Sequence, residues 1–428
     1  MTFPVKTKRK EKIMQSFLFV GVDTHKNSHT AAVFSNYFNS LATITFANSF
    51  LGFSNFLIKL EKLSDGRAMI FGLEDSQGLG NFLAEFLIKK GFYVVDIDPV
   101  TTDRGRRRTA HKDKSDDRDA CLIAKTLISK KDNLHKVIIN KTSLALRELV
   151  KSRELLIGES TRIKNRLHVA IFNQYMEVSA VFSDLFSKCA LAFFARYPDS
   201  SKLKGESSDS LTAFLKSNSR GRHGNKKAID ILSLVNTDIT PDILTDARSS
   251  IIKKHIKRLT SMQKELKEIS DMLSRLVLKS PHSTLTSVPG IDIVTAAKII
   301  SQVIDIGRFP SSSKLAKFIG VAPVEKSSGR KRRYQKSKHG KRYLYSAIFF
   351  IALNHISRTR DGRDNNPISR AYYLKKVSEG KTKKEAITCL ARRLTDVIYA
   401  IMRDGSIYSL SKVKSSGDIK VLETVASL

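Results

Sequence analysis

Residues 17–24 read FLFVGVDT, and this stretch decides the fold of the first part of the chain. Residues 17–22 form a continuous run of apolar, strand-forming side chains, and an acid, Asp23, follows directly. A second run, THKNSHTAAVF, comes next, and residues 42–46 form a third strand-like run. Short apolar runs joined by polar turns are typical of β-hairpins. The sequence therefore predicts hairpin strands at the start of a sheet.

Helices and further strands alternate after the hairpins. Residues 51–63 carry apolar side chains along one helical face, and the apolar run 68–73 (AMIFGL) predicts a buried strand that ends just before Glu74. A helix over about 79–90 leads to a strand over 92–97. This alternation indicates an α/β layer around a central sheet, and the hairpins make that sheet mixed.

Two further acids, Asp116 and Asp119, lie three residues apart at the start of a helix predicted from residue 116. The charged stretch 103–118 before them predicts a mobile loop that leads into this helix. Residues three apart share a helix face, and the apolar residues that continue this face are expected to pack on the sheet. The two carboxylates should then point toward the ends of the strands rather than into water.

The four acids Asp23, Glu74, Asp116 and Asp119 together suit a hard divalent cation, Mg²⁺ or Mn²⁺, which a few carboxylates and substrate phosphates can hold. Paired metals stabilise the attacking and leaving oxygens of a phosphoryl displacement. The alternative is that each acid only caps a strand or interacts with a helix dipole. A packed or solvated role is favoured for the two nearby histidines, and a solvated one for the neighbouring acids. These residues are His25, His29, Asp75, Asp113 and Asp117.

Three motifs, GVDTHKNSH, GLEDSQGLG and KSDDRDA, occur in that order. They resemble the DEDD motif of a family of bacterial insertion-sequence transposases, the bridge-RNA-guided recombinases related to the Piv DNA invertase. The resemblance implies a RuvC-type, RNase H-like first domain, with Asp23, Glu74, Asp116 and Asp119 as its catalytic acids. It also implies exchange of DNA strands guided by a structured RNA that the element encodes. A guide RNA fits the absence of a zinc finger or recognition-helix motif from the sequence.

The second half contains a turn at Pro289-Gly290 within residues 284–301, which looks like a helix-hairpin-helix. In such a unit the turn amides and a helix N-terminus face a phosphate. Residues 326–342 carry nine Lys or Arg and no acid, a composition that binds phosphates without reading sequence. The expected nucleic-acid contacts are Gly290, Arg330, Lys331, Arg332, Arg333, Lys338, Lys341 and Arg342.

The segment GVAPVEKSSGRKRR is similar to the C-terminal transposase domain of the same family. The resemblance implies that Ser328 is the nucleophile and forms a phosphoserine link to DNA, with Ser327 as the alternative. A serine hydroxyl needs a base, a metal or a polarised target, and the basic residues that follow can neutralise the phosphate. The other interpretation is that Ser327-Ser328-Gly329 is only a flexible turn in a basic loop.

A helical arm is expected between the two ends of the chain. Residues 243–278 repeat apolar side chains at nearly heptad spacing, with a break at Gln263. This pattern predicts either coiled-coil dimerisation or packing on the helical region 143–175, and both remain open. The expected division is a basic tail 1–15, a RuvC-like domain 16–140, an arm 141–280 with an inserted subdomain 182–240, a transposase domain 281–405 and a tail 406–428.

The composition limits the classes of function. Lys and Arg number 75 and Asp and Glu 41, which gives a net charge of +34 and points to a polyanionic partner. Three dispersed cysteines, no long apolar run and no secretory signal predict a cytoplasmic protein without disulfides. The expected partners are double-stranded DNA, a guide RNA and further copies of the chain. The rival classes are a hydrolytic nuclease that cuts branched DNA and a non-enzymatic nucleic-acid-binding protein.

Overall fold

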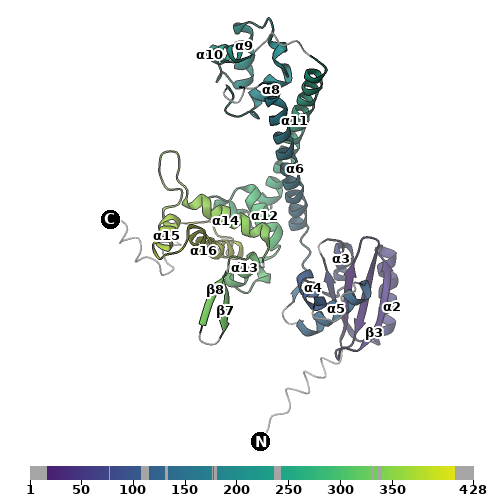
Figure 1. The fold of residues 1–428 in the computed structure, drawn as a ribbon. Coiled ribbons are helices and arrows are strands. Elements are labelled where there is room, and N and C mark those ends of the chain that lie inside the picture. The colour runs from purple at the N-terminus through teal and green to yellow at the C-terminus, as the bar shows by residue number, and fades with distance from the viewer. Residues whose placement is uncertain are drawn as a thin grey trace. The chain divides into compact units, whose positions relative to one another are not determined.

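A computed structural model describes residues 17–76, 78–107, 115–130, 134–175, 177, 181–235, 242–328, 331–335 and 340–409 (Figure 1). The chain divides into two compact units, residues 1–144 and 145–428. The first unit is a mixed α/β structure, and the second is mostly helical. Among the described residues, no helix combines the length and apolarity that crossing a membrane requires.

The first unit is built on a six-stranded sheet with the order β3-β2-β1-β4-β5-β6. The hairpin strands β1, β2 and β3 are antiparallel to one another, while β4 and β5 run parallel to β1. The mixed sheet predicted from the sequence is therefore confirmed. Its elements are β1 (Phe17–Thr24), β2 (Ser28–Phe34), β3 (Ser40–Ala47), α2 (Phe50–Ser64), β4 (Ala68–Glu74), α3 (Asn81–Lys89), β5 (Tyr93–Ile97), α4 (Pro99–Arg107), α5 (Asp116–Lys130) and β6 (His135–Lys136).

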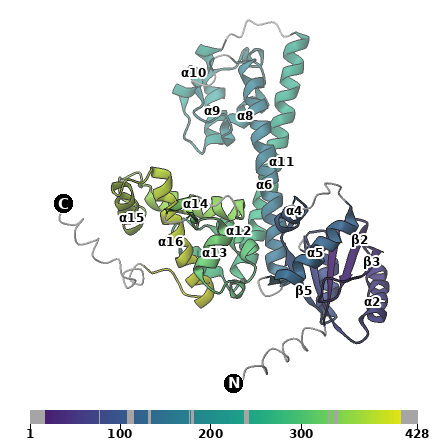
Figure 2. The same ribbon diagram turned by 60° about the horizontal axis from the view of Figure 1, so that its bottom comes forward.

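Helices cover both faces of this sheet (Figure 2). Buried phenylalanines and leucines of α2 and α3 pack on one face, together with Leu18, Val20 and Val22 of β1. The helix α5 covers the opposite face, where its residue Leu127 packs on Phe19. Successive strand residues point to opposite faces, so the odd-numbered residues of β1 point toward α5.

The charged stretch after β5 differs in part from the prediction. The sequence predicts a loop from residue 103, whereas the helix α4 extends over Pro99–Arg107. Proline fits the first turn of a helix, and the hydroxyl of Thr102 donates a hydrogen bond of 2.9 Å to the carbonyl of Pro99. Residues 108–114 lie outside the described part of the chain.

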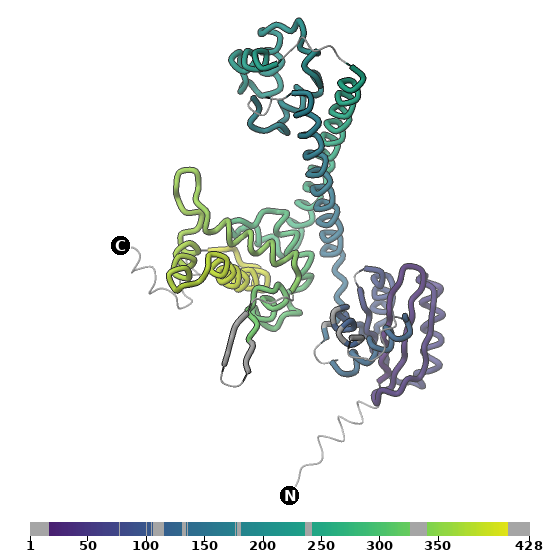
Figure 3. The backbone as a smooth tube through the Cα atoms, in the orientation of Figure 1, coloured from purple at the N-terminus to yellow at the C-terminus, as the bar shows by residue number. Residues whose placement is uncertain are grey.

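The second unit is organised along two long helices, α6 (Lys141–Phe172) and α11 (Ile243–Leu278), which lie side by side in opposite directions (Figure 3). One end of the pair carries the helices inserted after α6, and the other end carries the helices that follow α11. The remaining elements are α8 (Lys188–Arg196), α9 (Ser208–Ser219), α10 (Asn225–Leu234), α12 (Ile293–Val303), α13 (Ser312–Ile319), β7 (Val324–Ser328), β8 (Lys331–Gln335), α14 (Arg342–Ile356), α15 (Pro367–Ser378) and α16 (Lys383–Asp404), with short 3₁₀ turns at Ser200–Leu203, Ser283–Ser287 and Ile306–Arg308.

The apolar seam of α11 packs within the chain. Ile252 and Leu259 share a core with Leu167 of α6, and Leu273 shares another with Leu146. The packing of α11 on the helical region 143–175, one of the two predicted alternatives, is thus what the structure contains. The break at Gln263 is bridged by its neighbour, because Met262 is buried in the same core. Dimerisation through this helix stays a prediction.

Candidate active site

Two acids stand at adjacent strand ends of the sheet in the first unit. Strand β1 pairs with β4 in parallel up to Val22 and Leu73, so Asp23 and Glu74 are the next residues along the two strands. Alternation along the strands turns both toward the face that α5 covers. Asp23 is buried and Glu74 is half-buried.

A close helix contact brings the other two acids to this face. A Cβ atom added at Gly21 would lie 2.2 Å from the backbone nitrogen of Ala124 and 2.6 Å from the carbonyl oxygen of Ala120. The backbone of α5 therefore rests directly on that of β1, two residues before Asp23. The first turn of α5, which carries Asp116 and Asp119, consequently lies over the end of the sheet. The expectation that both carboxylates point away from water fits Asp119, which is buried, and does not fit Asp116, whose side chain is 57% exposed.

The start of α5 is capped by a hydroxyl rather than by an acid. The Oγ atom of Ser115 accepts a hydrogen bond of 3.3 Å from the backbone N–H of Arg118. The carboxylate of Asp116 is exposed, whereas Asp119 is buried. Ser115 therefore occupies the capping position, and Asp116 and Asp119 both lie in the first turn of α5, where an interaction with the helix dipole remains the alternative role.

An imidazole lies between two of the acids. The Nδ1 atom of His25 is 3.8 Å from a carboxylate oxygen of Asp23, and its Nε2 atom is 3.8 Å from one of Asp116. One ligand atom from each of these three residues falls within 4.8 Å of the other two. In the described part of the chain this is the group with metal-binding geometry, and Glu74 and Asp119 are not in it. Sequence reasoning left His25 out of the site, although its position two residues after Asp23 was the available signal.

The carboxylate and backbone of Glu74 are held by hydroxyl groups of two other elements. The hydroxyl of Thr102, on α4, lies 3.2 Å from Oε1 of Glu74 and shares its one proton between this carboxylate and the carbonyl of Pro99. The hydroxyl of Thr24, at the end of β1, donates a hydrogen bond of 2.8 Å to the backbone carbonyl of Glu74. Helix α4, which the sequence did not predict, therefore orients the carboxylate of Glu74.

The second histidine of the first motif is a structural residue. His29 is completely buried on β2, stacked at 5.9 Å on Phe53 and in edge contact with Phe46. Burial lowers the pKa of His29, and its Nδ1 atom accepts a hydrogen bond of 3.2 Å from the backbone N–H of His25. A neutral, packed His29 thus fixes the chain at the residue that lies between the acids.

The turn after β4 is shaped by Asp75. Asp75 adopts a left-handed conformation, with φ of 55°, and its carboxylate accepts a hydrogen bond of 3.0 Å from the backbone N–H of Leu79. A Cβ atom at Gly78 would meet this carboxylate at 2.1 Å, which explains the glycine. Asp75 is exposed, as expected, and its carboxylate also shapes the turn. Asp117 is exposed, as expected, and Asp113 lies outside the described residues.

The serine of the second half lies at the end of a two-stranded hairpin. Strands β7 and β8 pair antiparallel, and the last pair joins Ser328 to Lys331. The alternative interpretation of Ser327-Ser328-Gly329 as a flexible turn in a basic loop does not fit Ser327 and Ser328, since both belong to β7, whereas Gly329 lies outside the described residues. Lys331, Arg332 and Arg333 belong to β8, while Arg330 and Lys338 lie outside the described residues.

The remaining predicted nucleic-acid contacts lie at two helix starts. Lys341 caps α14 and Arg342 is its first residue, and both are exposed. Gly290 occupies the turn before α12 with φ of 80°, a backbone conformation that residues other than glycine rarely adopt. The turn is held by the buried His355, whose Nε2 atom lies 2.7 Å from the carbonyl oxygen of Pro289.

Comparison with known protein families identifies the class of the protein. A family model described as a transposase, of the DEDD and IS110 type, matches residues 20–176. A second, described as a transposase of the IS116/IS110/IS902 family, matches residues 282–374. The chain is thus an insertion-sequence transposase, a class of DNA recombination enzymes. It belongs to the IS110 family, and the family membership expected from the three motifs is confirmed.

Curated relatives agree with this assignment. The chain is 24% identical over 394 residues to the insertion element IS900 uncharacterized 42 kDa protein of Mycobacterium paratuberculosis, covering 91% of this chain and 97% of the relative. It is 25% identical over 299 residues to the insertion element IS110 uncharacterized 43.6 kDa protein of Streptomyces coelicolor, covering 69% and 72%. The pilin gene-inverting protein of Moraxella bovis is 31% identical over 123 residues, covering 28% of this chain and 36% of that protein.

Proposed function

We propose that this transposase cuts and rejoins DNA by a divalent-metal-dependent reaction in which Ser328 becomes covalently linked to DNA. The observation that carries the proposal is the meeting of Asp23 and Asp116 at one end of the sheet, across the glycine contact with α5. Carboxylates gathered in a basic protein repel one another unless a cation or a proton lies between them.

The side chains at this site fit a hard divalent ion. Asp23, Glu74, Asp116 and Asp119 offer oxygen ligands, which Mg²⁺ and Mn²⁺ prefer, and they come from two strand ends and one helix. These side chains would hold the ion, and the chemistry it would supply there is polarisation of the scissile phosphate and stabilisation of the charge that develops on it. The imidazole of His25 is a weaker partner for Mg²⁺, and we assign it the role of keeping Asp23 and Asp116 apart.

Ser328 is the proposed nucleophile. Its Oγ atom forms a bond to the phosphorus of the scissile linkage, the bond from phosphorus to the leaving sugar oxygen breaks, and the serine proton passes to solvent or a base. The phosphoserine ester retains the energy of the broken linkage, so a second strand end can displace the serine and rejoin the DNA. The position of Ser328 at the end of β7, paired with Lys331 of the basic strand β8, supports this role.

The fold supports an RNase H-like, RuvC-type assignment for residues 16–140. Three antiparallel strands precede two parallel ones, and acids stand at the ends of β1 and β4. We further propose residues 141–280 as a helical arm with the insertion 182–240, and residues 281–405 as the transposase domain. The tails 1–15 and 406–428 lie outside the described residues or nearly so.

A structured guide RNA and self-association complete the proposal. The net charge of +34 suits a protein that holds RNA and DNA together. Strand exchange requires several strands to be cut in concert, which favours a dimer or tetramer. Sequencing the RNA that copurifies with the protein tests the first point, and analytical ultracentrifugation with DNA tests the second.

The decisive experiment is to trap the covalent intermediate. The purified protein is incubated with DNA that carries the ends of its element and with Mg²⁺, and the mixture is denatured and examined for a protein–DNA adduct. The adduct should form in the wild type and in Ser327→Ala, and it should be absent from Ser328→Ala and Asp23→Asn. Cutting by Ser328→Ala without an adduct would identify a hydrolytic nuclease. Binding without cutting in every variant would identify a non-enzymatic binder.

A further inference from the structure

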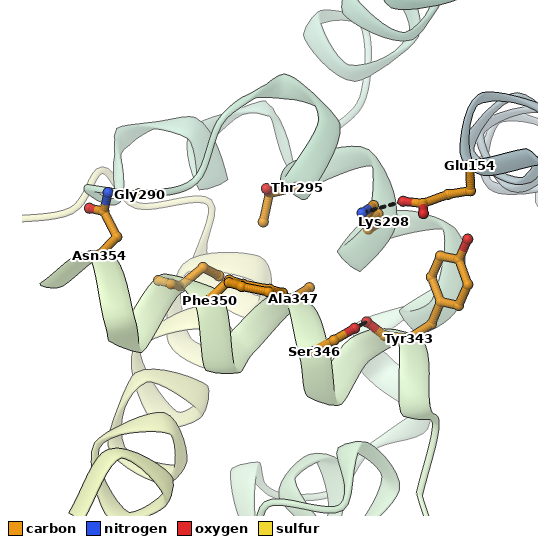
Figure 4. A pocket seen from close by; sticks show the side chains of 10 residues that line it. Glu154, Gly290, Thr295, Lys298, Tyr343, Ser346, Ala347, Phe350 and Asn354 are labelled. Atoms are coloured by element: carbon orange, nitrogen blue, oxygen red, sulfur yellow. Dashed lines mark hydrogen bonds and ion pairs between the residues drawn. The ribbon is translucent and has the colours of Figure 1, made fainter. Parts of the chain in front are cut away.

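A groove lies between α12 and α14 in the second unit and encloses about 460 Å³ (Figure 4). One side is a face of α14 that extends from Tyr343 to Asn354, and the other is α12 with Thr295 and Lys298. Glu154 of α6 closes one end. The volume lies in the range of pockets that bind small molecules, roughly 300–1,000 Å³. No residue of the groove belongs to the catalytic acids or to the basic hairpin.

Exposed aromatic rings line the α14 side of the groove. Phe350 is 67% exposed and Tyr343 is 40% exposed. The two residues are two turns apart on the same helix face, about 10 Å along the axis. An exposed phenylalanine at a groove has no partner ring or core contact to offset its contact with water. A planar ring that stacks on it would remove that apolar surface from water.

The interior of the groove is neutral although its surroundings are basic. The Nζ atom of Lys298 is 2.5 Å from the carboxylate of Glu154, and both side chains are largely buried. Burial and the charge of Glu154 raise the pKa of Tyr343, which keeps its phenol protonated as a hydrogen-bond donor. Because Lys298 is already paired, the groove does not favour a phosphate. Lys341 and Arg342, exposed directly before Tyr343, add positive charge close to this end of the groove, and the Nζ atom of Lys341 lies 5.9 Å from the centre of the Phe318 ring.

Amide and hydroxyl groups supply hydrogen bonds at the other end. Asn354 is exposed and lies against the turn at Gly290, where an added Cβ atom would come within 2.9 Å of its Oδ1 atom. The absence of a side chain at Gly290 therefore leaves room for this amide, and its positive φ is a second reason for a glycine there. An asparagine amide carries both donors and an acceptor and matches the polar edge of a nucleobase. Thr295 adds a hydroxyl from α12.

We propose that this groove binds one unpaired nucleobase, which stacks on Phe350 and is hydrogen-bonded by Asn354, while Lys341 and Arg342 bind the adjoining phosphates. The neutral aromatic interior matches the base and the cationic rim matches the backbone, as in other single-strand sites. A base within a duplex is stacked on both faces and paired at its edge, so it cannot enter. The groove thus distinguishes unpaired nucleotides from duplex, a function separate from strand cleavage.

The test measures binding by the full-length protein in EDTA, where no cutting takes place, so its outcome does not depend on the metal site or on Ser328. Fluorescence anisotropy compares a short oligothymidylate, an oligouridylate and a matched DNA duplex. Phe350→Ala should weaken single-strand binding by about 5- to 150-fold, since that factor is typical of base stacking on an aromatic side chain. Duplex binding should change by less than about twofold, as for an ordinary surface substitution. Comparing the two single strands shows whether RNA or DNA is preferred.

Matched variants separate stacking from general damage. Phe350→Tyr keeps the ring and should retain binding, and Phe172→Ala removes another exposed phenylalanine of the same unit and should have no effect. Asn354→Asp places a negative charge at the polar end and should weaken single-strand binding without altering the melting temperature.

Two binding results would overturn the inference. One is unchanged single-strand affinity in both Phe350→Ala and Asn354→Asp. If Phe350→Ala at the same time alters the sedimentation mass, the groove holds a second copy of the chain instead of a base. The other is an equal loss of duplex and single-strand affinity. Photo-crosslinking of 4-thiouridine RNA should label the peptide that contains Phe350, and labelling confined to residues 324–335 would also contradict it.

Discussion

Replacing Gly21 by alanine perturbs the contact that brings the acids together. The new Cβ atom would lie 2.2 Å from the backbone nitrogen of Ala124, whereas ordinary contacts of a Cβ atom begin at 3.4 Å. Helix α5 would therefore have to recede by roughly 1 Å, because backbone on both sides leaves no side chain to move away. We expect a loss of about 3 kcal/mol in the free energy of unfolding, the upper end for an overpacked core. Since misplacement by about 1 Å can reduce catalysis about 100-fold, DNA cutting should fall by a similar factor.

Urea denaturation and the adduct assay measure the two effects of Gly21→Ala. The matched control is Gly158→Ala in α6, where an added Cβ atom meets nothing within 4 Å. That change should stabilise the protein by about 0.5–1 kcal/mol, since alanine is the better helix residue. Binding to single strands by the second unit should survive both substitutions. A Gly21→Ala protein with wild-type stability and wild-type cutting would refute the close contact and with it the assembly of the acids.

Three further outcomes follow from the second unit. Burial lowers the pKa of His355 below its ordinary 6.5, so the imidazole binds a proton more readily in the unfolded chain than in the folded one. The free energy of unfolding should therefore fall as the pH drops below about 6.5. Urea denaturation at several pH values measures this fall, and His355→Gln should make stability depend less on pH. Asp242 caps α11 by accepting a 2.6 Å hydrogen bond from the N–H of Thr245. Asp242→Ala should lower the midpoint of urea denaturation, whereas an unchanged midpoint would show that this helix start does not limit stability. If Lys331 and Arg332 contact phosphates, changing each to Gln should reduce the magnitude of the slope of log affinity against log salt concentration by about 0.9. An unchanged slope would show that the DNA does not contact β8 through these residues.

The sheet and the placement of the four acids at two strand ends and one helix start were accessible from the sequence, because their signals are local. Apolar runs defined β1 and β4 to within two residues at each end, and an acid directly after a run marks a strand end. The three-residue spacing of Asp116 and Asp119 set their common direction on α5. Which strands are neighbours was less accessible, since the pairing of β1 with β4 depends on the crossover through α2.

Other parts of the site depend on contacts that no local pattern encodes. His25 is placed by a hydrogen bond from its backbone to the ring of the buried His29, and burial of a histidine cannot be read from its neighbours in the chain. The strands β7 and β8 carry mostly charged and polar residues, so they lack the alternation of apolar side chains that predicts a strand. The two strands nevertheless pair antiparallel along their whole length, from Val324 with Gln335 to Ser328 with Lys331.

The apolar seam of α11 illustrates a general limit of periodicity. Heptad spacing indicates that another helix covers one face of α11, but it does not indicate whether that helix belongs to another copy or to the same chain. In this protein α6 takes that position, since Leu146 and Leu167 meet opposite ends of the seam. A dimer formed along the arm must therefore use surface that this pairing leaves open. Leu155 of α6, which is 60% exposed, and Met272 of α11, which is 43% exposed, are among the apolar side chains that remain available for it.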